Sequence, residues 1–200
     1  MVNLLPLGEK ILTKRIDTRQ TSTIYLPDSQ KQKQEILMGK VLAKGRGSAL
    51  HNLRNVNEGD TIFYPSNAKI NVPEELTDEL RFQYDLTETD ELNLVEYNHI
   101  LVINDQLKGE KCIVTRVVES KSTIIVIGEQ KPTSNHFTGV VVVKGISGEK
   151  DTLEQSVHCG DKVVYGITDA VPVPDEIKKK FTINSGIADF VEYSKIVGTI

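Results

Sequence analysis

The chain contains one series of short sequence blocks twice, in the same order and about 100 positions apart. The block GEKILTKR at 8–15 recurs as GEKCIVTR at 109–116, and GKVLAKG at 39–45 recurs as GVVVVKG at 139–145. Three further blocks recur in the same order: 22–26 at 122–126, 56–60 at 157–161 and 95–100 at 191–196. Because order and spacing are both kept, the sequence predicts two tandem copies of one structural unit.

A short polar break separates the two copies. Asn104, Asp105 and Gln106 follow the apolar run 100–103. We therefore expect one domain over 1–104 and a second over 105–200. The offset between the copies shifts by a few residues only between blocks, where surface loops tolerate insertions.

Within each copy the sequence pattern is typical of short strands. Four valines at 140–143 lie between glycines, and the runs 61–64 and 162–165 each follow a Gly-Asp pair. Short β-branched runs interrupted by glycine predict an all-β fold, either a small barrel or a sandwich. The segments 73–80 and 174–180 begin with proline and early acids, which favours a helix or a single helical turn inside a loop.

The composition gives no support for several classes of partner. The chain has 24 basic and 28 acidic residues, a formal net charge of −4, so we expect neither nucleic acid nor an anionic membrane as a partner. Cys112 and Cys159 stand 47 positions apart and the four histidines are scattered, so we expect no metal site, no cofactor and no disulfide framework. The pair at 158–159 is interpreted as part of a turn, in preference to a nucleophile with its base.

The first six residues form too short an apolar run for a signal peptide and lack the composition of a transit peptide. No run approaches the roughly 18 apolar residues of a membrane helix. A cytoplasmic location is the expectation. A mature organellar product and a virus-encoded product in a host cytoplasm stay open.

The ordered motifs of the first copy resemble the GroES (chaperonin-10) family. The residues that carry the resemblance are PLGEKILTKR at 6–15, GKVLAKG at 39–45, VNEGDTIF at 56–63 and HILVI at 99–103. The second copy is more divergent, with Leu107 in place of Pro6, but it keeps Gly139, Gly145, Gly160 and Asp161. The resemblance implies two tandem GroES-like Greek-key β-barrel domains, assembly into a homo-oligomeric ring, and no enzymatic activity.

The resemblance also assigns a role to a long polar segment in each copy. Residues 16–38 are mostly Thr, Gln, Ser, Lys and Asp, and such a composition buries too little apolar surface to fold alone. The resemblance implies a mobile loop whose apolar tip binds the apical domain of a GroEL-type chaperonin. The expected binding residues are Ile24, Tyr25 and Leu26 in the first copy and Ile124, Ile125, Val126 and Ile127 in the second.

Two questions about these tips stay open at the level of sequence. Each apolar run also fits a short buried strand inside a long connection. In the second copy, counting from the opening strand aligns Ile24 with Ile125, whereas counting back from Gly139 aligns it with Ile124.

Two other parts of each copy are compared with the family pattern. The segments 46–55 and 146–153 correspond to a roof hairpin, and their small polar residues fit a hairpin tip. The segments 65–92 and 166–189 are longer than the family's usual connection. They either cover the end of a barrel or line an enlarged chamber.

Other functions compete with a co-chaperonin that caps a folding chamber. GroES-like domains also occur in zinc alcohol dehydrogenases, but the zinc ligands and the glycine-rich cofactor motif are missing here. An oligonucleotide-binding barrel needs aromatic platforms and a basic groove, whereas this chain is 6% aromatic and acidic. A structural or assembly protein built from small β-barrels, for example in a virion, is the remaining alternative. Two domains per chain do not tile a sevenfold partner evenly, so the ring stoichiometry is not predicted.

Overall fold

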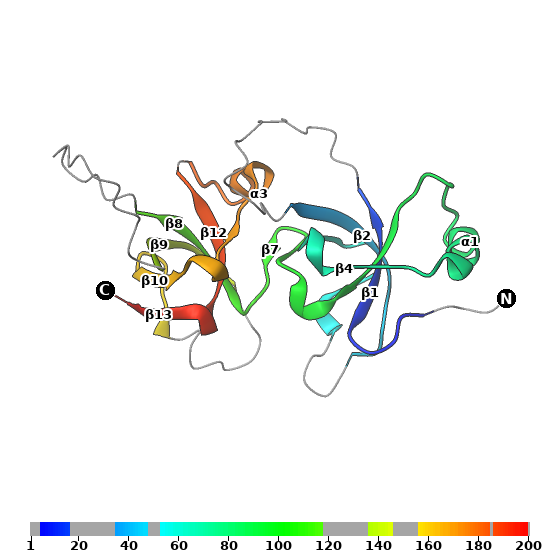
Figure 1. The fold of residues 1–200 in the computed structure, drawn as a ribbon, viewed down its shortest axis with the longest axis horizontal. Helices are drawn as coiled ribbons and strands as arrows, with labels where there is room; N and C mark the ends of the chain where they lie inside the picture. Colours follow the sequence, from blue (N-terminus) through cyan, green and yellow to red (C-terminus); the bar gives the residue numbers. More distant parts are fainter. Residues whose placement is uncertain are drawn as a thin grey trace, which may run out of the picture. The chain divides into compact units, whose positions relative to one another are not determined.

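A computed structural model describes residues 5–16, 35–47, 53–117, 136–145, 156–184 and 186–199. The chain divides into two compact units, Met1–Gln106 and Leu107–Ile200. The division falls two residues after the boundary expected from the sequence. Each unit is built mainly from strands, which Figure 1 colours from blue to green in the first unit and from green to red in the second.

The first unit is a Greek-key sheet. Its strands are β1 (Lys10–Arg15), β2 (Ile36–Lys44), β3 (Thr61–Pro65), β4 (Lys69–Asn71), β5 (Leu92–Glu96) and β6 (Val102–Ile103), with β7 (Gln106–Leu107) at the division between the units. Among the described residues the strand order is β4-β5-β1-β2-β3-β6-β7, and the pairs from β4 to β6 are antiparallel. Three successive strands pair as neighbours and a later one returns beside the first, which defines a Greek key.

The second unit repeats this topology. Its strands are β8 (Lys111–Arg116), β9 (His136–Lys144), β10 (Lys162–Gly166), β11 (Val171–Pro172), β12 (Ala188–Glu192) and β13 (Ile196–Thr199). Their order in the described part of the sheet is β11-β12-β8-β9-β10-β13. The run β12-β8-β9-β10 therefore corresponds strand by strand to β5-β1-β2-β3. The predicted all-β fold with tandem Greek-key units is confirmed.

The opening strand of each unit carries a register shift at the same place. The shift lies between Leu12 and Thr13 in β1 and between Ile113 and Val114 in β8, which are equivalent at an offset of 101. Such an irregularity bends a strand and increases its local twist. The repeat therefore extends from sequence motifs to a detail of the backbone.

Each sheet encloses an apolar core, and most residues of the two cores are equivalent. The first core includes Ile11, Leu37, Val41, Val56, Ile62, Tyr64, Val95 and Tyr97. The second includes Cys112, Val114, Val141, Val157, Val163, Tyr165, Val191 and Tyr193. The two cores draw on the opening strand, the long second strand, the strand after the Gly-Asp turn, and the Val-Glu-Tyr block.

The Gly-Asp turns predicted from the sequence are present in both units. Gly59 and Gly160 adopt φ values of +89° and +97°, a region that side chains with a Cβ rarely enter. Each glycine N–H donates a hydrogen bond of 2.8 Å to the carbonyl of Val41 or Val141. In the second unit His158 N–H donates to Asp161 Oδ2 at 2.8 Å, which places the pair at 158–159 in this turn.

The long segments after β3 and β10 each form a helix that buries one apolar side chain. Helix α1 (Glu74–Gln83) follows Pro73, and α3 (Asp175–Lys180) follows Pro174, as the sequence predicted. Leu80 of α1 is buried in a second cluster with Leu12, Ala43 and Leu92, and Ile177 of α3 is fully buried. Whether these segments cover the end of a barrel or line an enlarged chamber stays a prediction.

The expected roof hairpin of the first unit needs a correction at its end. Residues 48–52 lie outside the described part, but Leu53–Asn55 form a 3₁₀ turn (η1). Leu53 is buried in the core, and Lys44 Nζ donates to its carbonyl at 3.0 Å. The end of this segment is therefore part of the domain core and not of an exposed hairpin tip, because the Leu53 side chain packs into the core. The equivalent segment 146–153 lies outside the described residues.

Four short 3₁₀ turns complete the described structure. They are η2 (Ser66–Ala68), η3 (Tyr97–His99), η4 (Ile167–Asp169) and η5 (Tyr193–Lys195). The turns η2 and η3 have equivalents in η4 and η5 of the second unit. In the motif at 99–103, His99 belongs to η3 and only Val102–Ile103 form a strand, β6.

Candidate functional site

The residues expected to bind a chaperonin lie outside the described part of the chain. These are Ile24, Tyr25 and Leu26 of the first copy and Ile124, Ile125, Val126 and Ile127 of the second. The structure does describe the residues on either side of the two polar segments. We call these flanking residues the loop roots.

In the first unit the two ends of the segment 17–34 leave from neighbouring strands. Arg15, the last residue of β1, pairs with Gly39 of β2. The Ile16 N–H donates a hydrogen bond of 2.8 Å to the Met38 carbonyl. The segment therefore begins and ends within one antiparallel strand pair.

The second unit holds its segment, 118–135, in the same backbone frame. Arg116, the last residue of β8, pairs with Gly139 of β9, and the Val117 N–H donates to the Thr138 carbonyl at 2.9 Å. On the other side of each opening strand, Arg15 N–H donates to the Glu91 carbonyl at 2.8 Å, and Arg116 N–H donates to the Ile187 carbonyl at the same distance. The segments 17–34 and 118–135 thus start and end at equivalent places in their units.

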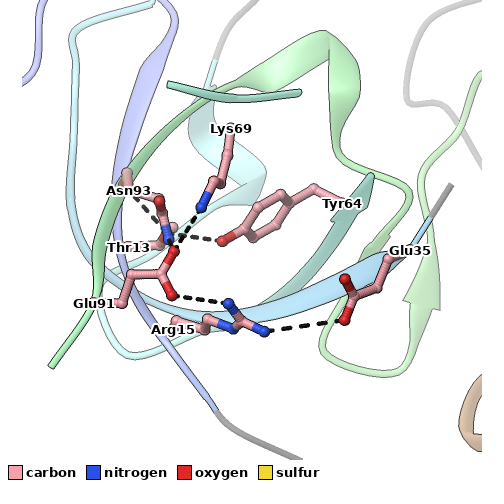
Figure 2. Close-up of polar contacts among 7 residues, drawn as sticks. All are labelled: Thr13, Arg15, Glu35, Tyr64, Lys69, Glu91 and Asn93. Carbon is pink, nitrogen blue, oxygen red and sulfur yellow. Dashed lines mark hydrogen bonds and ion pairs between the residues drawn. The ribbon is translucent and has the colours of Figure 1, made fainter. Parts of the chain in front are cut away.

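The side chains at the first root form a partly exposed ionic cluster (Figure 2). Arg15 Nη1 lies 2.8 Å from Glu91 Oε2, and Lys69 Nζ lies 2.8 Å from the other oxygen, Glu91 Oε1. Arg15 Nη2 is 4.0 Å from Glu35, which directly follows the loop segment. The hydrogen bond from Lys69, assisted by Arg15, lowers the pKa of Glu91 to about 2 despite partial burial. We call Arg15, Glu35, Lys69 and Glu91 the first root cluster.

Beneath this cluster lies a neutral polar contact in the core. Thr13 Oγ1 donates to the Asn93 carbonyl at 3.2 Å and contacts the Tyr64 hydroxyl at 3.5 Å. Asn93 Nδ2 reaches Glu91 at 3.4 Å, while Asn93 Oδ1 has no hydrogen-bond partner among the described residues. Burial raises the pKa of Tyr64, so its hydroxyl stays neutral at physiological pH. The buried groups Thr13, Tyr64 and Asn93 are therefore all uncharged.

In the second root, the position equivalent to Asn93 carries a charged residue, Asp189. Arg116 Nε and Nη2 bind the two oxygens of Asp189 at 2.6 and 2.9 Å, and the Tyr165 hydroxyl donates to Asp189 Oδ2 at 2.8 Å. The guanidinium carbon of Arg116 lies 3.6 Å from the centre of the Phe137 ring. Asp189 is completely buried. We call Arg116, Phe137, Tyr165 and Asp189 the second root cluster.

The charges of the second cluster stabilise one another. Burial disfavours the charged form of Arg116, but its hydrogen bonds to Asp189, the charge of that carboxylate and a contribution from Tyr165 together raise its pKa. Burial and the neighbouring carboxylate raise the pKa of Tyr165, which therefore acts as a hydrogen-bond donor to Asp189. The planar guanidinium fork suits this bidentate contact.

Neither root cluster was identified from the sequence, where Lys14-Arg15 and Thr115-Arg116 stand out only as members of the repeat. One signal was present: Asp189 stands within the otherwise apolar run Ala188–Val191, at a strand position that alternation would bury. A buried acid in a strand requires a partner, but the sequence did not show that Arg116, 73 positions away, supplies it.

Comparisons with known proteins identify the family of the first unit. The model of the chaperonin 10 kDa subunit family matches residues 3–103. The co-chaperonin GroES of Staphylococcus carnosus is 35% identical over 65 residues, which cover 30% of this chain and 69% of that protein. The co-chaperonin GroES of Shouchella clausii is 37% identical over 83 residues, covering 38% of this chain and 86% of that protein.

The fold and the roots define a chain of two homologous all-β units, each carrying a long connection between its first two strands. The chain belongs to the chaperonin 10 family, since the family model spans half of its length. No helix among the described residues is long and apolar enough to cross a membrane. Within the same residues, no cluster of three or more metal-binding side chains occurs.

Proposed function

We propose that the chain is a co-chaperonin that caps the folding chamber of a GroEL-type chaperonin through the apolar tips of its two loops. The observation that supports this most directly is the repeated root. Both copies keep a long polar segment with an apolar centre, at the same point between paired strands, with matching backbone hydrogen bonds of 2.8 and 2.9 Å. If the second copy served only to space or support the first, it would not need such a segment.

The energetics fit a lid that is released in each cycle. Burying three apolar side chains contributes roughly 4.5–9 kcal/mol, at about 1.5–3 kcal/mol each. Ordering the loop offsets much of this gain, at about 1–2 kcal/mol per residue fixed. A single loop therefore binds weakly, and several loops on one ring bind firmly through their high effective concentration. In this proposal the chain assists ATP-dependent folding but has no catalytic site of its own.

The test is a binding measurement with variants of the loop tips. I24S/L26S and I125S/I127S together are expected to weaken nucleotide-dependent binding to a chaperonin by a factor of about 100 or more, since apolar burial is lost at both tips. The matched control is Q30S/Q34S, which changes two polar residues of the first segment. Unchanged binding of the tip variant would refute the proposal, and unfolding of the domain would support a buried strand.

Single substitutions decide which residues form the second tip. If the tip is Ile125, Val126 and Ile127, then I124S has little effect on binding and I127S weakens it. If the tip is Ile124, Ile125 and Val126, the two results are exchanged. Equal weakening by both variants would mean that all four residues contact the partner.

Assembly into a homo-oligomeric ring belongs to the same proposal. Closed symmetric rings are common among homo-oligomers, and two domains per chain give an even number of domains in any ring of whole chains. A sevenfold partner would then face a lid of different symmetry, or a ring that also contains single-domain subunits. Native mass spectrometry of the chain alone gives the number of copies. We also propose that it acts in the cytoplasm, in the same compartment as its chaperonin.

A further inference from the structure

We propose that the two loops are held by different physical means, so that salt loosens the first root much more than the second. In this proposal Arg116 and Asp189 are positioning residues that fix the second loop at its exit. The first loop is held by the partly exposed contacts of Arg15 with Glu35 and Glu91. The consequence for chaperonin binding rests on the function proposed above, whereas the difference between the roots does not.

The backbone frames of the roots match, so the side chains are what differ. Ile16 and Val117 donate equivalent hydrogen bonds across the strand pair, at 2.8 and 2.9 Å. Arg15 and Arg116 end equivalent strands and pair with equivalent glycines, Gly39 and Gly139. The chain therefore supplies its own matched control for each root.

The decisive position lies in the strand that pairs with the opening strand on its other side. Asn93 pairs with Thr13 of β1, and Asp189 pairs with Val114 of β8, so both occupy the same place in the sheet. With an amide at this place, Arg15 turns to the carboxylates of Glu91 and Glu35. With a carboxylate there, Arg116 turns inward and binds it with two hydrogen bonds.

Solvent exposure separates the two clusters further. Glu35, which links Arg15 to the far end of the loop, is 64% exposed, and its contact is 4.0 Å long. Asp189 is 0% exposed, and the Phe137 ring covers one face of Arg116. Mobile ions screen exposed charges over about 3 Å at 1 M salt, whereas buried pairs are screened much less. The first root therefore depends on ionic strength much more than the second, in which Arg116 is 21% exposed and Asp189 is fully buried.

The difference matters for a loop that orders when it binds. A loop whose root is already fixed has fewer residues left to order on docking, so less of its binding free energy is lost. The second loop is expected to keep its affinity at high salt, while the first loses affinity as its root loosens. A lid with two such loops would release its first loop more readily.

The first measurement uses the free protein and needs no chaperonin. Hydrogen exchange of the Ile16 and Val117 amides is followed at low salt and at about 1 M NaCl, and each rate is normalised to an unstructured peptide. The proposal expects exchange at Ile16 to accelerate about threefold or more, with little change at Val117. Equal salt responses at the two amides would overturn it.

Two substitutions exchange the chemistry of the roots. N93D is expected to draw Arg15 inward and to remove the salt response at Ile16. D189N is expected to give Val117 a salt response, because Arg116 loses its buried carboxylate. The controls are N98D and E176Q, which change the charge by the same amount at exposed positions of the same units. If N93D leaves the response at Ile16 unchanged, the proposed role of this position is wrong, even if D189N does not fold.

Binding to a chaperonin tests the consequence. The variant I125S/I127S leaves only the first tip intact, and I24S/L26S leaves only the second. The proposal expects the apparent Kd of I125S/I127S to rise with salt several-fold more than that of I24S/L26S. Equal salt dependence would overturn the link to binding. If neither variant nor the unaltered chain binds at any salt concentration, the proposed function fails, while the exchange data still decide the difference between the roots.

Discussion

The first and second units place different groups at one buried position of the same sheet. Asn93 in the first unit is an amide whose neighbours Thr13 and Tyr64 are neutral. Asp189 in the second unit is a carboxylate bound by Arg116 and Tyr165. The backbone pairing around the two positions is equivalent. One change from amide to carboxylate is thus accommodated without a change of fold.

The neighbours of this position differ as a set. Where Thr13 contacts the Tyr64 hydroxyl in the first unit, Val114 offers Tyr165 no polar group, and Tyr165 donates to Asp189 instead. Leu37 of the first core is replaced by Phe137, whose ring lies against both Arg116 and Tyr165. The divergence of the second copy is therefore coordinated, because a buried charge requires every nearby partner to suit it.

The largest expected effect comes from removing the buried carboxylate. D189A leaves Arg116 without its partner and is expected to destabilise the second unit by about 3–5 kcal/mol. N93A removes a neutral amide whose Oδ1 has no partner among the described residues, and is expected to cost the first unit about 1–2 kcal/mol. Native-state hydrogen exchange at the equivalent amides of Val41 and Val141 measures each unit separately.

An independent measure of the second unit's stability comes from Cys112. Cys112 is fully buried, so a thiol reagent reaches it only when the unit opens. Burial also raises the pKa of its thiol to about 12, which keeps the reactive thiolate scarce in the closed unit. In a C159S background, D189A should speed the labelling of Cys112, and N93A should leave it unchanged. Equal losses of stability from D189A and N93A would contradict the difference drawn between the units.

The next effect concerns the two buried tyrosines. Y165F removes a hydrogen bond to a charged acceptor and is expected to cost about 1.5–3 kcal/mol. Y64F removes a long contact to Thr13 and is expected to cost about 0.5–1 kcal/mol. Chemical denaturation of the two variants, with exchange at Val41 and Val141 as unit-specific reporters, gives both numbers. A larger loss of stability for Y64F than for Y165F would contradict the claim that the hydrogen bond to Asp189 is the stronger of the two.

A smaller effect is expected from the aromatic cover of Arg116. F137L places in the second root the residue that the first unit has at the equivalent position, Leu37. The loss of the cation–π contact is expected to cost about 1 kcal/mol. The reverse change, L37F, gains no such contact because Arg15 points toward Glu91. Stabilisation of the first unit by L37F would show that Arg15 also samples an inward position.

The smallest effect is a pH dependence at the first root, because Glu91 is 38% exposed and solvent screens its ion pairs. Because the pKa of Glu91 is lowered to about 2, its contribution to stability is complete above about pH 4.5 and is lost as the pH falls toward 2. E91Q should therefore be less stable than the unaltered chain at pH 7, and the difference should vanish near pH 2. Thermal unfolding at several pH values measures this. A constant difference would mean that Glu91 acts through packing.

Much of the fold was predictable because local signals repeat. The Gly-Asp pairs preceded β3 and β10, and Pro73 and Pro174 preceded the two helices. The 3₁₀ turns were not predicted, since three-residue turns such as Ser66–Ala68 carry little sequence pattern. The burial of Leu53 was also missed, because its polar neighbours suggested a surface hairpin.

The roots were less accessible to sequence reasoning than the strands. Arg15 has acids available at positions 35, 90 and 91, and their choice depends on strand register across 76 residues. The inward turn of Arg116 depends on Asp189, Tyr165 and Phe137 together, and no local pattern connects these three. The apolar tips were predicted from composition and resemblance, and they stay a prediction.

The most direct test of the proposed function is native mass spectrometry of the chain mixed with a GroEL-type chaperonin and nucleotide. We predict a complex that carries several copies of the chain, forms only with nucleotide, and is lost in I24S/L26S combined with I125S/I127S. The same complex should form with the polar control Q30S/Q34S. Absence of any complex with the unaltered chain, or a complex that persists in the tip variant, would contradict the proposal.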